Sequence, residues 1–344
     1  MISGSYTAII TPFEGAAVDY EGLGQLVDFQ VENGITGVLA VGTTGESPTL
    51  TWEEHNKVVE LVAARTRDRV LCIAGTGSNN TAETIAATTH AVDVGVSGVL
   101  LVDPYYNGPS SLEIRKEYVE PVATAFPDLD IIPYVIPGRT GAQLLPEDLA
   151  ILSQNHRNVG TVKEATGNFE NMRRTRECCG ADFSIMSGDD SVTVQMMTDP
   201  KINAAGVISV ISNVVPRAIA DMVRLLEKGD EKQARAVVSQ IEPLFDLVTV
   251  TTTESTPFGD TPCRARNPLA IKTLIAILGM PAGGCRKPMG KMTRKGLDVV
   301  LETARTVHAG SPAVFAPLAD FFGVNIDARL DTPSCWEGLS YEDD

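Results

Sequence analysis

The sequence predicts an α/β protein, a (β/α)8 TIM barrel with a C-terminal helical appendage. Short apolar runs recur along the first 215 residues, helical patterns separate them, and the strand pattern stops after Pro216. The runs begin roughly 23 to 33 residues apart, which leaves room for one strand, one helix and two loops in each unit. Alternating strands and helices imply a parallel sheet, and near-continuous apolar strands imply burial on both faces. Eight such units fit a closed barrel better than an open sheet.

Each barrel strand is predicted from an apolar run that ends in small or polar residues. In chain order the runs are YTAII from Tyr6, GVLAV from Gly37, VLCIAG from Val70, GVLLVD from Gly98, IIPYVI from Ile131, VGTVK from Val159, FSIMSG from Phe183 and GVISV from Gly206.

The intervening segments carry helix signals. The TWEE stretch at 51–54 is a capping box, Gly95 suits the C-terminal end of a helix, and Pro146 suits a first helical turn. After Pro216 the helical patterns cover 217–227, 231–248, 268–278 and 293–307.

These patterns divide the chain into three parts. We expect a catalytic barrel over residues 1–215 and a helical domain over 216–312. The remaining segment, 313–344, holds seven acidic residues and one arginine, so we expect an acidic tail extension that is partly disordered.

The composition excludes several classes of protein. Acidic residues number 44 against 28 basic ones, and the formal net charge of −16 argues against nucleic acid or an anionic membrane as a partner. The six cysteines form no C-x-x-C pair and the four histidines are scattered, so no metal site is predicted. No run approaches the roughly 20 apolar residues of a membrane span, and the N-terminal stretch lacks a signal-peptide pattern. We therefore expect a cytoplasmic protein.

In a (β/α)8 barrel the active site lies at the C-terminal ends of the strands, so the residues at and just past each run are the candidates. They combine one lysine with phenols, hydroxyls and an arginine. From the second run onwards they are Thr43 and Thr44, Tyr105 and Tyr106, Tyr134 and Arg139, Lys163, the SGDD stretch from Ser187, and Ile208.

Lys163 is the most informative of these, because it ends an apolar strand where an unpaired ammonium is costly to bury. One interpretation is a lysine that extends to water; the other is an altered pKa and a chemical role. A neutral lysine amine can attack a ketone and form an iminium, an electron sink that makes the adjacent carbon a nucleophilic enamine. Desolvation, or a nearby cation such as Arg139, would lower the pKa toward the roughly 7–8 of catalytic lysines. Arg139 is also suited to hold a substrate carboxylate.

Two further motifs suggest phosphate binding and metal binding, but each is weaker evidence than the set of strand-end residues. GTTGES resembles a phosphate loop but lacks the Gly-Lys-Ser/Thr ending. Asp189 and Asp190 suggest a metal ligand pair, but capping of the next helix is the simpler interpretation.

Seven motifs occur in the order found in the dihydrodipicolinate synthase family of pyruvate-dependent class I aldolases, and the chain resembles that family over roughly residues 6–310. They are GTTGES, AGTGSNNTAE, PYYNGPS, PYVIPGRTG, VKEATGN, SGDD and GVISVISN. The resemblance implies a lyase that condenses pyruvate with L-aspartate 4-semialdehyde to 4-hydroxy-tetrahydrodipicolinate, in the diaminopimelate branch of lysine biosynthesis. It also implies a homotetramer, a dimer of dimers, that needs no metal and no pyridoxal phosphate.

The resemblance assigns roles to single residues. Lys163 forms the Schiff base with pyruvate, and Tyr134, Thr43 and Tyr106 relay protons, with Tyr106 reaching across a tight dimer interface. Thr44 binds the pyruvate carboxylate and Arg139 receives the carboxylate of the semialdehyde. The full set of implied substrate-binding residues is Thr44, Arg139, Ile208 and Gly188.

Members of this family often bind lysine at the dimer interface as a feedback inhibitor. Here Glu83 would pair with the α-amino group, Asn79 would bind the carboxylate, and Trp52 would offer a flat apolar face to the alkyl chain. The alternative is that Trp52 and His55 are only first-turn helix residues. The matching positions are Ser47, Pro48, Trp52, His55, Asn79, Glu83 and Tyr105.

The chain departs from the family pattern at two places. Val135 replaces the asparagine that usually follows the strand tyrosine, and NPLAIK at 267–272 replaces NPIPVK. We expect Val135 to alter the polarity of the site, and hence the second substrate more than the Schiff base. The alternative function is another pyruvate-dependent aldolase, lyase or hydratase of the N-acetylneuraminate or keto-deoxy-sugar acid type, although such enzymes usually lack Arg139. A non-catalytic regulator that binds pyruvate or lysine is a more distant alternative.

Overall fold

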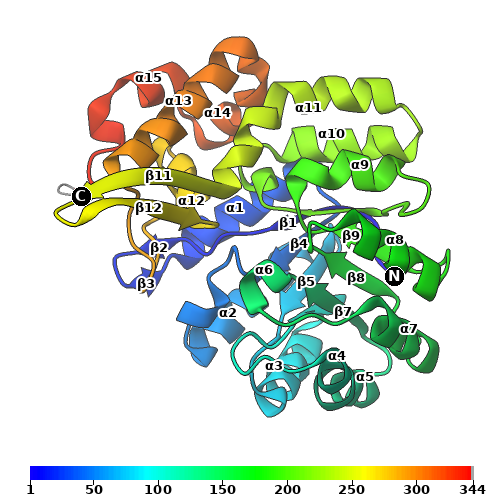
Figure 1. The fold of residues 1–344 in the computed structure, drawn as a ribbon. Coiled ribbons are helices and arrows are strands. Elements are labelled where there is room, and N and C mark those ends of the chain that lie inside the picture. Colours follow the sequence, from blue (N-terminus) through cyan, green and yellow to red (C-terminus); the bar gives the residue numbers. More distant parts are fainter. Residues whose placement is uncertain (342–344) are drawn as a thin grey trace.

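The computed structural model describes residues 1–341, and a closed barrel of eight parallel strands forms its centre (Figure 1). The strands follow the order β1-β10-β9-β8-β7-β6-β5-β4, and β1 pairs with both β10 and β4 to close the ring. Each predicted run forms one strand, so the predicted fold class is confirmed. The barrel strands are β1 (Gly4–Ala8), β4 (Gly37–Ala40), β5 (Leu71–Gly75), β6 (Gly98–Val102), β7 (Asp130–Val135), β8 (Thr161–Glu164), β9 (Ser184–Ser187) and β10 (Gly206–Ser209).

Helices follow the strands and cover the outside of the barrel (Figure 1). The predicted capping box is present, since Thr51 Oγ1 accepts from the Glu54 N–H at 3.2 Å and Glu54 Oε2 accepts from the Thr51 N–H at 3.0 Å. Gly95 ends its helix with φ 85°, in the left-handed conformation that glycine adopts without a Cβ clash. The outer helices are α1 (Tyr20–Glu32), α2 (Trp52–Thr66), α3 (Thr81–Val94), α4 (Ser111–Glu113), α5 (Glu120–Ala125), α6 (Pro137–Thr140), α7 (Pro146–Asn155), α8 (Phe169–Cys179), α9 (Thr193–Thr198) and α10 (Pro216–Glu227), with a π-helical segment (Ile114–Val119) between α4 and α5.

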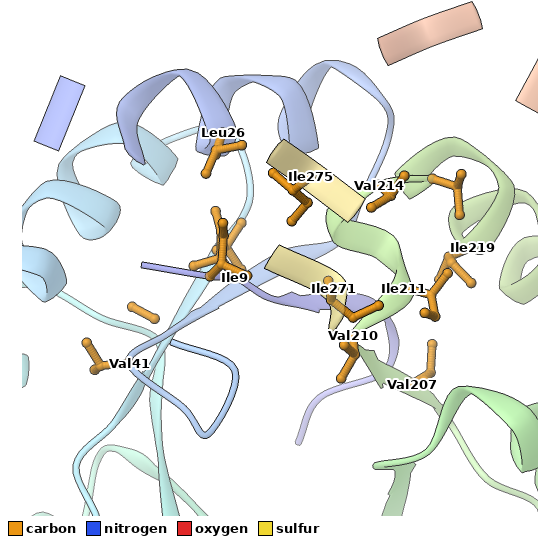
Figure 2. Close-up of a cluster of buried hydrophobic side chains, with 14 of the residues drawn as sticks. Ile9, Leu26, Val41, Val207, Val210, Ile211, Val214, Ile219, Ile271 and Ile275 are labelled. Atoms are coloured by element: carbon orange, nitrogen blue, oxygen red, sulfur yellow. The ribbon is translucent and has the colours of Figure 1, made fainter. Parts of the chain in front are cut away.

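Side chains alternate between two hydrophobic cores because successive strand residues point to opposite faces. One core fills the barrel and includes Tyr6, Tyr134 and Ile208. The larger core lies between the barrel and the helices. Figure 2 shows part of it, where Ile271 and Ile275 lie among side chains that include Leu26 and Val214. These two isoleucines belong to α12 (Leu269–Ile277), so the larger core includes a helix of the C-terminal part of the chain.

The helical patterns predicted after residue 216 are present as α10, α11 (Glu231–Phe245), α12 and α13 (Arg294–Gly310). Short 3₁₀ turns cover Ser47–Thr49, Asp190–Val192, Ile211–Asn213, Asp246–Val248, Pro312–Val314 and Pro333–Cys335. Within residues 1–341, none of the helices combines the length and the apolar character that crossing a membrane would require.

The prediction that strands stop after Pro216 is wrong. β11 (Thr249–Thr256) and β12 (Gly259–Arg266) form an antiparallel hairpin between α11 and α12, which Figure 1 shows in yellow. Most of its side chains are exposed or half-buried, so the segment has no apolar run to reveal it. The threonine-rich sequence TVTTTEST was the available signal, because β-branched residues favour strands. A second short hairpin joins β2 (Phe13–Glu14) and β3 (Ala17–Val18).

The C-terminal extension is folded through residue 341, so the expectation of partial disorder is wrong for the described part. Its helices are α14 (Ala316–Phe322) and α15 (Ile326–Asp331). The rings of Phe321 and Phe322 lie 5.4 and 5.3 Å from the ring of Phe29 on α1, so apolar contacts hold this acidic segment on the barrel helices. Residues 342–344 lie outside the described residues. The bounds of the three predicted domains stay predictions.

A buried ion pair joins the appendage to the barrel. Lys272 on α12 is 1% exposed and Glu46 is fully buried, and their Nζ and Oε1 atoms lie 2.7 Å apart. Lys272 Nζ also donates to the carbonyls of Thr11 and Gly284, at 2.9 Å each. The second carboxylate oxygen of Glu46 accepts from the Arg286 N–H at 2.9 Å. The pair is therefore satisfied on both sides, which buried charges require.

We expect Lys272→Met to lower the free energy of unfolding by about 3–5 kcal/mol, because it leaves the Glu46 carboxylate buried without its cation. The double variant Lys272→Met/Glu46→Gln should lose less than the sum of the two single changes. Urea unfolding followed by circular dichroism measures both. Arg235→Gln is the control, since its ion pair with Glu231 is exposed and should contribute at most about 0.5 kcal/mol. A loss below about 1 kcal/mol for Lys272→Met would contradict the structural role of the pair.

Candidate active site

Lys163 lies inside the barrel at the C-terminal end of β8. It is in register with Tyr134 on β7 and Met186 on β9, and both of these side chains belong to the core inside the barrel. Only 4% of Lys163 is exposed, and its Nζ lies 4.3 Å from the centre of the Tyr134 ring. Strand register therefore brings together the two residues that the sequence singled out most clearly.

The environment of Lys163 favours a neutral amine. Burial lowers the pKa of Lys163 from 10.5 to about 7, the charge of Asp190 opposes this change and the charge of Arg139 adds to it. Across residues 1–341, no hydrogen bond or ion pair reaches Lys163 Nζ, although Tyr134 offers the face of its ring. A large fraction of this amine is therefore a free nucleophile at neutral pH.

Tyr134 is in the state that a proton donor requires. Burial raises the pKa of the Tyr134 phenol to about 12, while the charge of Arg139 and a hydrogen bond with Thr43 act in the opposite direction. The phenol is thus protonated at neutral pH and can pass its proton on. Thr43 lies on the turn after β4, so two of the predicted relay residues contact each other.

Thr44 and Arg139 are joined through Asn267, a residue for which no role was predicted. The side-chain amide of Asn267 donates to Thr44 Oγ1 at 3.0 Å, and Arg139 donates to the Asn267 carbonyl at 3.2 Å. Because Thr44 Oγ1 accepts from Asn267, its own O–H proton stays available for a carboxylate. Asn267 precedes α12, so the appendage positions both predicted carboxylate-binding residues.

The SGDD stretch supports the base of the site. Asp189 caps the following 3₁₀ turn by accepting from the Ser191 N–H at 3.0 Å, as predicted. Asp190 differs from the prediction, because its carboxylate accepts from the N–H groups of Val210 and Ile211 at 2.9 and 3.1 Å, past the end of β10. A methyl group on Gly188 would lie 2.8 Å from Ala165 Cβ and 3.2 Å from Lys163 Cε, so glycine avoids a clash at the end of β8, beside the lysine side chain.

A cavity of about 180 Å³ opens at this end of the barrel. Thr43, Tyr134 and Arg139 line it together with Ser47, Pro48 and Tyr105. Small hydroxylated, phenolic and cationic groups thus converge on one space that is large enough for a small carboxylic acid.

Five predicted catalytic or substrate-binding residues are not among those that line this cavity in the single chain, namely Lys163, Thr44, Gly188, Tyr106 and Ile208. Tyr106 is 86% exposed, and Ile208 is fully buried in the core inside the barrel. Their predicted roles, a relay across an interface and a pocket carbonyl, stay predictions.

The expectation that Val135 alters the polarity of the site is wrong. Val135 is 2% exposed and belongs to the core between barrel and helices, whereas Tyr134 belongs to the core inside the barrel. Adjacent strand residues point to opposite faces, so Val135 points away from Lys163.

The residues matched to a lysine site lie on the 3₁₀ turn Ser47–Thr49, on α2, in and just before α3, and in the loop after β6. Trp52 is 42% exposed and its ring lies edge-on to that of His55, 5.0 Å away. His55 Nε2 donates to the Gly75 carbonyl at 2.9 Å, and burial lowers the pKa of His55. Asn79 Oδ1 accepts from the Tyr105 N–H at 2.7 Å, which leaves its amide N–H groups for a ligand. Glu83 accepts from Ser78 Oγ at 2.6 Å.

Among residues 1–341, no group of three or more histidine, cysteine, aspartate or glutamate side chains could hold a metal ion. The absence of a cofactor from the reaction stays a prediction.

Comparison with known proteins decides the family. The sequence model of the Dihydrodipicolinate synthetase family matches residues 1–306. The chain belongs to this family. It is 40% identical over 293 residues to the 4-hydroxy-tetrahydrodipicolinate synthase of Syntrophus aciditrophicus, covering 85% of this chain and 94% of that protein.

Solved structures agree with this assignment. Dihydrodipicolinate synthase from Aquifex aeolicus has a TM-score of 0.80 and 37% identity over 92% of this chain and all of that one. The enzyme from Cyanidioschyzon merolae, solved with lysine bound, has a TM-score of 0.80 and 32% identity over 89% of this chain and 98% of that one. The family and the enzyme class predicted from the motifs, a lyase of the class I aldolase type, are therefore confirmed.

Within this dihydrodipicolinate synthetase family member, sequence reasoning missed Asn267 and the influence of Asp190 on Lys163. Asn267 was visible as the first residue of NPLAIK, but nothing local indicates that it lies beside Thr44, 223 positions away. Asp190 was visible in SGDD, and only the barrel geometry shows that its charge raises the pKa of Lys163.

We expect the Lys163 amine to titrate near pH 7, because burial disfavours the ammonium form. Competitive labelling with acetic anhydride from about pH 5 to about pH 11, with mass spectrometry of the Lys163 peptide, measures the midpoint. Arg139→Gln should move the midpoint upward, since the Arg139 charge lowers the pKa of Lys163, whereas Arg235→Gln should leave it unchanged. A midpoint close to the ordinary value of 10.5 would contradict the proposed neutral amine.

Proposed function

We propose that this chain is a 4-hydroxy-tetrahydrodipicolinate synthase that condenses pyruvate with L-aspartate 4-semialdehyde through a Schiff base on Lys163. The relative from Syntrophus aciditrophicus carries this name at 40% identity, which favours the synthase over the sugar-acid aldolases and the regulator considered above. The observation that carries the mechanism is the desolvated Lys163 amine facing Tyr134.

The first half-reaction begins with the neutral amine of Lys163. It attacks the carbonyl carbon of pyruvate, water leaves, and the resulting iminium draws electrons from the adjacent methyl carbon. Loss of a proton from that carbon gives the enamine. The iminium is the electron sink, so the proposal needs neither a metal nor pyridoxal phosphate.

Thr44 and Tyr134 support this step in different ways. The Thr44 hydroxyl, oriented by Asn267, donates to the pyruvate carboxylate. Tyr134, in contact with Thr43, gives a proton to the carbonyl oxygen that leaves as water and takes protons back in later steps. Tyr106 extends this relay from a partner subunit, and its 86% exposure in the single chain is compatible with that role.

The second half-reaction joins the two substrates. The enamine carbon attacks the aldehyde carbon of the semialdehyde, and the new alkoxide is protonated through Tyr134. The substrate amine then attacks the iminium carbon and displaces Lys163, which closes the ring. Arg139 holds the substrate carboxylate throughout through charge-assisted hydrogen bonds. Gly188 and the Ile208 carbonyl complete the walls of the pocket.

We further propose that the enzyme is a cytoplasmic homotetramer, built as a dimer of dimers, and that L-lysine inhibits it. The lysine-bound structure from Cyanidioschyzon merolae supports such a site in this family. In this chain Glu83 would receive the α-amino group, and the amide of Asn79 would donate to the carboxylate. Trp52 would cover the alkyl chain.

Borohydride reduction in the presence of pyruvate should leave one adduct, on Lys163, detectable by mass spectrometry of the digested protein. Lys163→Arg keeps the charge but not the nucleophile, so it should abolish the adduct and lower kcat with L-aspartate 4-semialdehyde by about a thousandfold or more. Lys232→Arg, on the exposed face of α11, is the matched control and should retain both. An adduct at another residue would rule out the mechanism. Normal trapping without turnover of the semialdehyde would keep the Schiff base and overturn the second substrate.

Millimolar L-lysine should lower the initial rate of the wild-type enzyme. Glu83→Gln should weaken this inhibition by about tenfold, because one charge-assisted contact with the α-amino group is lost. Glu53→Gln, an exposed neighbour of Trp52, removes the same charge and should leave the inhibition unchanged. An initial rate insensitive to lysine in the wild type would show that the proposed regulatory site does not operate.

A further inference from the structure

Arg266 of the β11–β12 hairpin contacts the backbone beside Arg139, and Arg264 lies two residues earlier on β12, so both side chains point to the same face of the strand. Arg266 donates to the Gly138 carbonyl at 3.0 Å, and Arg139 donates to the Asn267 carbonyl at 3.2 Å. Each guanidinium therefore binds the backbone directly next to the other arginine. We call Gly138, Arg139, Arg266 and Asn267 the arginine clasp.

The charges of these arginines are not balanced by the protein. After burial, which is the larger cause, the charges of Arg266 and Arg264 lower the pKa of Arg139. Within the described residues no carboxylate pairs with any of the three, whereas Arg115, Arg174 and Arg286 each form an ion pair. Like charges at short range repel unless an anion lies between them. In a chain of net charge −16, such a cluster indicates a site that an anion completes.

The cluster lies where the second substrate has to arrive. Arg139 lines the cavity together with Tyr134. Arg264 is exposed and Arg266 is half-buried, so the cluster borders the solvent. The cluster therefore lies between the solvent and the cavity that is lined by Tyr134, the residue whose ring faces Lys163 Nζ.

The hairpin holds these arginines in place. Lys295 on α13 binds the Thr253 carbonyl, and its Nζ lies 3.2 Å from Glu254 Oε2. Thr252 Oγ1 lies 3.3 Å from Thr293 Oγ1 at the start of the same helix. Since β12 runs directly into Asn267, a hairpin fixed to α13 also fixes the clasp.

We propose that Arg264 and Arg266 extend the carboxylate site of Arg139 into a cationic surface that captures the carboxylate of the second substrate and selects an anionic aldehyde. This inference rests on the proposed function, in which Arg139 receives that carboxylate. Arg266 is a positioning residue, because it holds the α6 backbone beside Arg139. Arg264 acts through its charge, which attracts the anionic substrate and raises the rate at which it associates with the site.

Arg264 provides the sharper test, because no hydrogen bond to it is present among residues 1–341 and its replacement should not disturb folding. Arg264→Gln should raise KM for L-aspartate 4-semialdehyde by roughly three- to tenfold, with kcat within about twofold of wild type. Arg264→Lys should restore the wild-type KM, because the charge returns. The fall of kcat/KM with added KCl should be shallower in Arg264→Gln than in wild type.

Arg266→Gln should raise the same KM further, and Arg266→Lys should restore it only in part, because an ammonium cannot reproduce the guanidinium contact with Gly138. Borohydride trapping of pyruvate on Lys163 should be unchanged in all four variants. Arg235→Gln removes the same charge from an exposed arginine on α11 that pairs with Glu231 and is not part of the clasp, and it should leave KM and its KCl dependence at wild-type values.

The outcomes separate this inference from the function on which it rests. A wild-type enzyme that traps pyruvate but does not convert the semialdehyde would overturn the proposed function and this inference together. A wild-type enzyme that converts it, with Arg264→Gln matching wild type in KM and in KCl dependence, would overturn this inference alone. Loss of trapping in Arg264→Gln would also contradict it, since the defect would then lie in the first half-reaction.

Discussion

The ammonium group of Lys272 is the contact on which the geometry of the site depends. It bonds to Thr11 after β1, to Glu46 after β4 and to Gly284 after α12, so three distant segments meet at one buried charge. Glu46 has φ 57°, a left-handed conformation that is unfavourable for a side chain with a Cβ and persists only where its surroundings hold it. The turn that carries Thr43 and Thr44 precedes it directly. A helix outside the barrel thus fixes the end of the turn from which Thr43 lines the cavity.

The chain contains two buried lysines with different electrostatic surroundings, and the difference explains the site. Burial lowers the pKa of both, but Glu46 and two carbonyls stabilise the charged form of Lys272. The Lys163 amine instead faces the ring of Tyr134. The charge of Asp190 raises the pKa of Lys163, and the charge of Arg139 lowers it. The same side chain is thus a structural cation in one place and a nucleophile in the other. What distinguishes them is the number of hydrogen-bond acceptors within reach.

The sequence was sufficient for the barrel and for the pair Lys163 and Tyr134, because buried parallel strands are apolar throughout and the strand-end rule then locates the chemistry. It was insufficient for strands made of exposed polar residues and for contacts between residues far apart in the sequence. The β11–β12 hairpin has no buried face, and the contacts of Arg139 with Asn267 and of Arg266 with Gly138 each span 128 residues. The orientation of Val135 could have been predicted, because Val135 follows Tyr134 on the same strand and adjacent strand residues point to opposite faces. Folding of the extension depends on Phe321 and Phe322, which its acidic composition obscured.

The arrangement of the arginine clasp has a consequence for the biosynthesis of the protein itself. The residues proposed to contact pyruvate lie before residue 216, as does Arg139, whereas Arg264, Arg266 and Asn267 lie well after it. A ribosome that has released only the barrel has therefore produced the imine-forming lysine and Arg139, but not the hairpin arginines proposed to extend the acceptor site, nor Asn267, which orients Thr44. The orientation of Thr44 and the proposed extension of the acceptor site are therefore both completed only when the hairpin and α12 dock. The C-terminal third of the chain is thus the last part of the active site to be synthesised.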